Sequence, residues 1–273
     1  MLRNIPSVSQ CFTSAFVFFE LVTEITESEK EFACRRGTIV SLMESEIRKE
    51  WLLPSDRLVI AFPFLTHKAE HMDQFHRLLS CVIDSQSVQE FERLIADRQL
   101  AGYLDLLCHE HSDMVNVAQI IREAPGLHEI AEAIIKKNRP LASKQEKRAM
   151  FRRGLEMTSR YYKAIGYPDT IDSFACKAVA QCIPDATEND VQRAVASYDG
   201  SLSIFLTALD RALLECQAGC HIPHENDFAD LLHLMYLCEG DTLVCEEGDM
   251  KLITRAAHSA GISVLRIENL LEG

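Results

Sequence analysis

The sequence predicts an α/β protein that is rich in helix and has a small parallel sheet. Three observations predict this class. Residues 11–19 form an apolar run that is typical of a buried strand running into a helix. Residues 67–218 carry apolar side chains at helical spacing, without strand-like alternation. Residues 226–266 then read as helix, strand, helix and strand, an order typical of parallel α/β sheets.

The first long helix is predicted by a capping-box pattern. Thr26 with Glu29, or Ser28 with Glu31, can open a helix that continues through about Leu52. Pro54 then ends it.

The middle of the chain is predicted to hold five or six helices. Pro and Gly residues divide it, and Ser143 with Glu146 and Thr187 with Asp190 are typical of helix starts. This is too much helix for a simple crossover between strands. We therefore expect a single domain over 1–273 in which 67–218 forms a helical insertion. The predicted breaks lie at Pro125, Pro140, Gly166, Pro168, Pro184 and Gly200.

The C-terminal part alternates regularly. Asn226 or Asp227 can cap a helix that continues to Leu237, and residues 242–245 are a short buried-strand candidate. A helix over 250–259 and a strand over 262–266 complete the pattern.

Composition bounds the class of protein. With 273 residues and 47% hydrophobic content, the chain can bury a sizeable core. The ten cysteines are scattered, mostly inside apolar helical patterns, which is typical of reduced core cysteines. Apolar runs are far shorter than a membrane span, and the N-terminus has no signal-peptide pattern. We expect a cytoplasmic protein that has no membrane partner.

The net charge of −13 hides a basic window. Residues 136–163 contain ten basic and two acidic side chains, with Phe151, Tyr161 and Tyr162 interleaved. This composition is typical of a surface that contacts phosphates and bases of nucleic acid. It is equally typical of a solvated helix face or of a docking face for an acidic partner.

Acidic side chains gather in two places near the C-terminus. Asp227 and Asp230 are three residues apart and share a helix face, and Glu246, Glu247 and Asp249 directly follow the strand candidate. Ligands of open α/β sheets bind in the crevice outside the carboxyl ends of the strands. We therefore expect these acids to converge on one crevice, although acids at a helix start and after a strand are also ordinary surface features.

Three separated segments resemble the PIN-domain family of metal-dependent nucleases. They are TSAFVFFELV at 13–22, NDFADLLHLMYL at 226–237 and TLVCEEGDM at 242–250. The first is similar to the family's strand leading to a Glu-Leu at the start of a helix, the second to its acid-bearing helix, and the third to a strand followed by acidic positions. The resemblance covers the two ends of the chain and implies a PIN-like three-layer fold.

The resemblance implies a divalent-metal-dependent endonuclease that hydrolyses RNA, most commonly single-stranded. It maps metal ligands onto Glu20, Asp230 and Glu247, with Asp227 as the alternative to Asp230 and with Asp249 as a further catalytic acid. Oxygen-only ligation selects Mg²⁺ or Mn²⁺ over zinc.

RNA is the expected partner, and the sequence leaves open which protein partner the chain has. A second copy of the chain and an antitoxin-like protein are both candidates. Salt-sensitive contacts with the RNA backbone are expected from six basic residues, Arg35, Arg36, Lys147, Arg148, Arg152 and Arg153.

The start of the chain departs from the family pattern. The family opens with a strand ending in an Asp that is the first metal-site acid, and nothing over 1–19 supplies it. We expect either that the protein begins upstream of Met1 or that the chain is a decayed member. In the second case it is a catalytically inactive module that binds nucleic acid or protein.

Two other interpretations remain open. Cys216, Cys220, His221 and His224 have a spacing that can suggest zinc, although the four are crowded into nine residues. An all-helical regulator is the other interpretation, and it requires that the three strand candidates do not pair.

Overall fold

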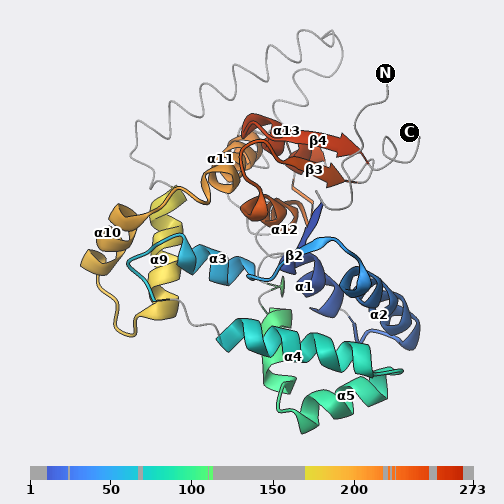
Figure 1. Ribbon diagram of the computed structural model, residues 1–273. Helices are drawn as coiled ribbons and strands as arrows, with labels where there is room; N and C mark the ends of the chain where they lie inside the picture. Colours follow the sequence, from blue (N-terminus) through green and yellow to red (C-terminus); the bar gives the residue numbers. More distant parts are fainter. Residues whose placement is uncertain are drawn as a thin grey trace.

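The structure is a computed structural model that describes residues 11–23, 25–66, 70–109, 111–112, 170–217, 221, 223–224, 226–245 and 251–266. The described part is rich in helix and contains two small parallel sheets (Figure 1). Residues 101–109 and 111–112 are also helical. The elements in chain order are β1 (Phe12–Ser14), α1 (Ala15–Thr23), α2 (Glu29–Glu44), β2 (Arg48–Glu50), α3 (Pro54–Ile60), α4 (Glu70–Asp84), α5 (Val88–Asp97), α9 (Thr170–Cys182), α10 (Glu188–Ser197), α11 (Ser203–Gln217), α12 (Asp227–Asp230), the 3-10 helix η2 (Leu231–Tyr236), β3 (Thr242–Cys245), α13 (Lys251–Ser259) and β4 (Ser263–Arg266).

The first sheet pairs β1 with β2 in parallel, and α1 and α2 form the crossover between the two strands. The predicted run of strand into helix is confirmed, but the strand is shorter than expected. It ends at Ser14, and the helix already begins at Ala15. Glu20 therefore lies within α1 rather than at its start.

α2 begins as predicted and ends earlier. The Ser28 side chain accepts a hydrogen bond from the amide of Glu31, so the second of the two capping patterns is the one formed. The helix ends at Glu44 instead of continuing to about Leu52. The prediction that Pro54 ends this helix is wrong, since Pro54 occupies the first turn of α3, where its missing amide costs nothing.

The second sheet pairs β3 with β4 in parallel, with α13 as the crossover. Thr242 lies opposite Ser263, and Cys245 lies opposite Arg266. The predicted strand over 242–245 is confirmed, and the last strand begins one residue later than expected. Because these strands pair, the all-helical interpretation is wrong.

The expectation of one sheet is only partly met. In the described ranges, β1 pairs with β2, and β3 pairs with β4, as two separate two-stranded sheets. The parallel α/β character is thus present, while a three-layer PIN-like arrangement stays a prediction.

The predicted acid-bearing helix is also interrupted. Only Asp227–Asp230 is α-helical, and Leu231–Tyr236 continues as a 3-10 helix. A 3-10 helix has three residues per turn, so positions three apart align in one row.

Between residues 70 and 217, the elements that the structure describes are all helices, joined by short turns. The predicted breaks at Pro184 and Gly200 separate α9, α10 and α11, and Thr187 with Asp190 forms the predicted capping box. The other predicted breaks and the Ser143–Glu146 start lie outside the described residues. No described helix is long and apolar enough to cross a membrane.

A continuous apolar core joins these elements. In Figure 1, α4 and α5 lie at one end of the molecule and the β3–β4 pair lies at the other, with α1 and α12 between them. α11 contacts both α13 and η2. Phe16, Phe18 and Phe19 of α1 are completely or almost completely buried, so α1 is a central element against which the C-terminal part packs.

Candidate functional site where the two ends of the chain meet

Glu20 and His233 form the contact between the two ends of the chain. The Nε2 atom of His233 lies 3.4 Å from the Oε2 atom of Glu20, and both side chains are partly exposed. The His233 ring also packs edge-on against Phe16, with 4.9 Å between the ring centroids. Glu20 and Phe16 of α1 thus both contact His233 of η2. This junction between α1 and η2 holds the Glu20 carboxylate in place while leaving it partly exposed to solvent.

Asp230 lies one 3-10 turn before His233, the η2 residue that contacts Glu20. Asp230 precedes η2, and the 3-10 geometry aligns it with His233 and Tyr236. The buried hydroxyl of Tyr236 donates a hydrogen bond of 2.8 Å to the carbonyl of Leu52. The row that carries Asp230 is therefore fixed against the segment between β2 and α3 as well as against α1.

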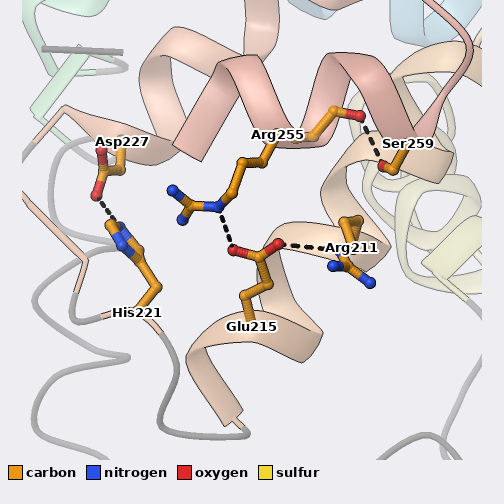
Figure 2. Close-up of polar contacts among 7 residues, drawn as sticks. Arg211, Glu215, His221, Asp227, Arg255 and Ser259 are labelled. Atoms are coloured by element: carbon orange, nitrogen blue, oxygen red, sulfur yellow. Dashed lines mark hydrogen bonds and ion pairs between the residues drawn. The ribbon is translucent and has the colours of Figure 1, made fainter. Parts of the chain in front are cut away.

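Asp227 binds the linker before α12 and not the α1–η2 junction. Its Oδ2 atom lies 2.6 Å from Nε2 of His221 and accepts a hydrogen bond of 2.6 Å from the backbone amide of His224 (Figure 2). Burial alone would raise the pKa of Asp227, but the hydrogen bonds from His221 and His224 outweigh it and lower that pKa. The carboxylate of Asp227 is thus ionised, buried and bound to the linker that precedes α12.

Sequence reasoning missed the most buried charged group of the described region. The side chain of Glu215 is completely inaccessible, and its two oxygens accept hydrogen bonds from Nε of Arg211, at 2.9 Å, and Nε of Arg255, at 2.8 Å. Figure 2 shows Glu215 between these two arginines. The i,i+4 spacing of Arg211 and Glu215 is visible in the sequence, but Arg255 comes from α13 and only the fold reveals it.

The Glu215 backbone also connects this cluster to Asp227. The amide of His221 donates a hydrogen bond of 3.2 Å to the carbonyl of Glu215, and the ring of the same histidine binds Asp227. The start of α12 is therefore tied through His221 to α11, and through Glu215 to α13.

The two predicted phosphate contacts on α2 bind backbone carbonyls instead of standing free. Arg35 donates from Nη1 to the carbonyl of Glu20 at 3.0 Å, and Arg36 donates from Nη2 to the carbonyl of Ile83 at 2.9 Å. These bonds fix α2 against α1 and α4. Lys147, Arg148, Arg152 and Arg153 lie outside the described residues.

The predicted metal ligands are only partly described. Glu20 and Asp230 supply oxygen donors of the kind that Mg²⁺ prefers, but Glu246, Glu247 and Asp249 lie outside the described residues. Within the described ranges, no group of three or more His, Cys, Asp or Glu side chains can hold a metal ion. The described residues therefore do not form a metal site by themselves.

The same finding applies to the zinc interpretation. Cys216 is buried, His221 binds Asp227, and Cys220 lies outside the described residues. The described members do not converge on a metal-binding group.

Comparison of the chain with family models, with curated proteins and with solved structures found no match.

Proposed function

We propose that the chain is a PIN-like, divalent-metal-dependent endonuclease that cuts single-stranded RNA. One observation carries the proposal: Glu20 of α1 and His233 of η2 are in contact, and Asp230 lies on the same row as His233. The fold thus brings together two segments that resemble the acid-bearing segments of one family, although they come from opposite ends of the chain.

In this proposal Glu20, Asp230 and Glu247 hold the ion. Mg²⁺ or Mn²⁺ would supply an activated water and would stabilise charge on the phosphate oxygens. Glu20 presents its carboxylate to solvent while its contact with His233, whose ring packs against Phe16, limits its freedom. Arg35 holds the backbone carbonyl of Glu20, so it orients the turn that carries the carboxylate. The basic window over 136–163 would bind the RNA backbone.

A second candidate function is a catalytically inactive PIN-like module that binds nucleic acid or protein. The observation that favours it is that residues 11–19, which include β1 and the start of α1, contain no Asp or Glu. The family places an Asp at the end of its first strand. Without that Asp, the site has one anionic ligand fewer for a hard cation.

RNA cleavage tests the proposal. The purified chain is incubated with single-stranded RNA and Mn²⁺, with EDTA in a parallel sample. We expect cleavage that requires the metal and falls by about 100-fold in Glu20→Gln and in Asp230→Asn, a loss typical of removing one group that stabilises transition-state charge. Glu27→Gln is the matched control, because Glu27 is exposed and lies just beyond α1.

Two results would contradict the proposal. Cleavage that persists in both variants defeats the site assignment. Salt-sensitive retention of RNA without any cleavage by the parent defeats the nuclease proposal and favours the binding module.

A further inference from the structure

A cavity of about 190 Å³ lies between α2, α4 and the segment after β2, on residues that the proposed nuclease does not use. Six residues line it. Met43 comes from α2, Trp51 directly follows β2, and the remaining four residues belong to α4. The lining residues are Met43, Trp51, His76, Leu79, Ser80 and Ile83.

The walls of this cavity are fixed by contacts outside it. The four α4 residues follow the i, i+3, i+4, i+7 spacing of one helix face. Arg36 of α2 donates a hydrogen bond to the carbonyl of Ile83, which holds α2 against α4 at one end. Phe18 of α1 stacks on Trp51, with 5.2 Å between ring centroids and 27° between ring planes. The space between the helices is therefore bounded by side chains that cannot easily collapse into it.

The lining is mainly apolar and aromatic. Trp51 and His76 meet edge to face, at 4.6 Å and 89°. Ser80 is exposed and places its hydroxyl at the edge of the cavity, where it donates a hydrogen bond of 3.0 Å to the carbonyl of His76. Such a lining favours a flat ring, because aromatic rings gain from edge-to-face and offset contacts in addition to burial.

One polar atom of the lining residues lacks a partner. Nε2 of His76 is buried and has no hydrogen-bond partner among the described residues. An unsatisfied buried nitrogen costs stability, and a ligand that supplies the missing hydrogen bond recovers part of this cost. The nitrogen is covered, so binding in this way requires the His76 imidazole to turn until Nε2 faces the ligand.

The size limits the ligand. A protein cavity of about 150 Å³ with apolar walls accepts benzene. A cavity of about 190 Å³ therefore has room for one six-membered ring and a small substituent.

We propose that this cavity is a binding site for a small planar ring that carries one hydroxyl group, of the size of phenol. The ring lies against Trp51, Leu79 and Ile83, and the hydroxyl bonds to His76. The proposal does not depend on the nuclease activity.

Trp51 provides a direct test, because it is the only tryptophan in the chain. Phenol is titrated into the full chain while tryptophan fluorescence is excited at the red edge, where tyrosine and phenol absorb little. We expect a saturable change with a Kd of about 1 mM, the range open to so small a ligand. Benzene is expected to bind about 3- to 10-fold more weakly, because it cannot make the hydrogen bond.

Variants locate the site. Ile83→Phe fills the cavity and is expected to weaken phenol binding by at least about 10-fold, whereas Ile60→Phe adds the same ring at an exposed position of α3 and leaves binding unchanged. Ser80→Phe serves as a second filled variant, because an exposed position tolerates the ring. His76→Phe is expected to abolish the preference for phenol over benzene.

Three results overturn the proposal. They are the absence of a saturable signal in the folded parent, undiminished phenol binding in both filled variants, and equal affinity of the parent for phenol and benzene.

Discussion

Arg255 reaches from α13 to the fully buried carboxylate of Glu215 on α11, with 2.8 Å between its Nε and Oε2. Arg211 binds the other oxygen, so among the described residues the charge of Glu215 is neutralised by one arginine from α11 and one from α13. A carboxylate buried without its partners is strongly unfavourable. These ion pairs therefore make the packing of α13 on α11 dependent on two arginines that are themselves partly exposed.

We expect Arg255→Ala to lower the free energy of unfolding by about 2 kcal/mol. This is less than the loss typical of a broken buried pair, because Arg211 remains and Arg255 is partly exposed. Urea denaturation measures the change. Arg93→Ala is the control, since the Arg93–Glu90 pair is exposed and should contribute no more than about 0.5 kcal/mol. An equal loss in both variants would contradict the buried character of the Glu215 cluster.

Asp227 should stabilise the fold in a pH-dependent way. Its pKa is lowered in the folded state from the usual 3.8, because the hydrogen bonds from His221 and His224 outweigh burial. A lowered carboxyl pKa gives stability that is present above the unfolded pKa and is lost as the pH falls through the folded pKa. We expect Asp227→Asn to cost about 1–2 kcal/mol at neutral pH and less below about pH 4.

Urea midpoints of parent and variant between pH 7 and about pH 3 check this expectation. Asp97→Asn, at an exposed position, should change neither the midpoint nor its pH dependence. A difference between parent and Asp227→Asn that stays constant down to the lowest pH would argue against an ionised, hydrogen-bonded Asp227.

Tyr236 should make the protein sensitive to alkali. Burial is the largest influence on its hydroxyl and raises the pKa of Tyr236 far above its usual 10.0. A raised folded pKa means that the stability is complete below the unfolded pKa and falls as the pH rises beyond it. The parent should therefore lose stability above about pH 10, and Tyr236→Phe should lose less there.

The same variant tests the hydrogen bond to Leu52. At neutral pH, Tyr236→Phe removes the donor and should cost about 1–2 kcal/mol. Thermal unfolding followed by circular dichroism measures both effects. A variant as stable as the parent at neutral pH would contradict the hydrogen bond.

RNA binding by the basic window can be tested without a nuclease activity. We expect the double variant Arg152→Glu/Arg153→Glu to bind single-stranded RNA more weakly and with a smaller dependence on salt, because fewer counterions are released. Filter binding over a range of salt concentrations measures both quantities. Arg93→Glu/Lys177→Glu, two exposed changes on α5 and α9, alters the net charge by the same amount and serves as the control. Equal salt slopes in the parent and the double variant would exclude the window as the RNA contact.

Local sequence patterns predicted the elements that local forces determine. The caps at Ser28 and Thr187 and the strand over 242–245 each depend on a few neighbouring residues, and all three are confirmed. The sequence patterns did not predict β2, because Arg48, Lys49 and Glu50 are all charged. Its strand conformation depends on pairing with β1 and not on any apolar alternation.

The candidate site was less accessible to sequence reasoning. The contact between Glu20 and His233 joins opposite ends of the chain, and the row through Asp230 exists because the helix tightens into a 3-10 helix after Asp230. Neither a tertiary contact nor a change of helix type is encoded in a short sequence pattern. The three-layer fold and the metal ligands stay predictions.

The Glu20–His233 contact joins segments much farther apart in the chain than either strand pair does. β1 with β2, and β3 with β4, join segments that are close in the chain, so each pair closes a short loop at low entropic cost. Contacts of α1 with η2 require almost the whole chain. During synthesis, α1 emerges before η2 has been made, so the contact of Phe16 with His233 can form only later. A nascent chain that has not yet reached η2 therefore lacks the junction between Glu20 and His233.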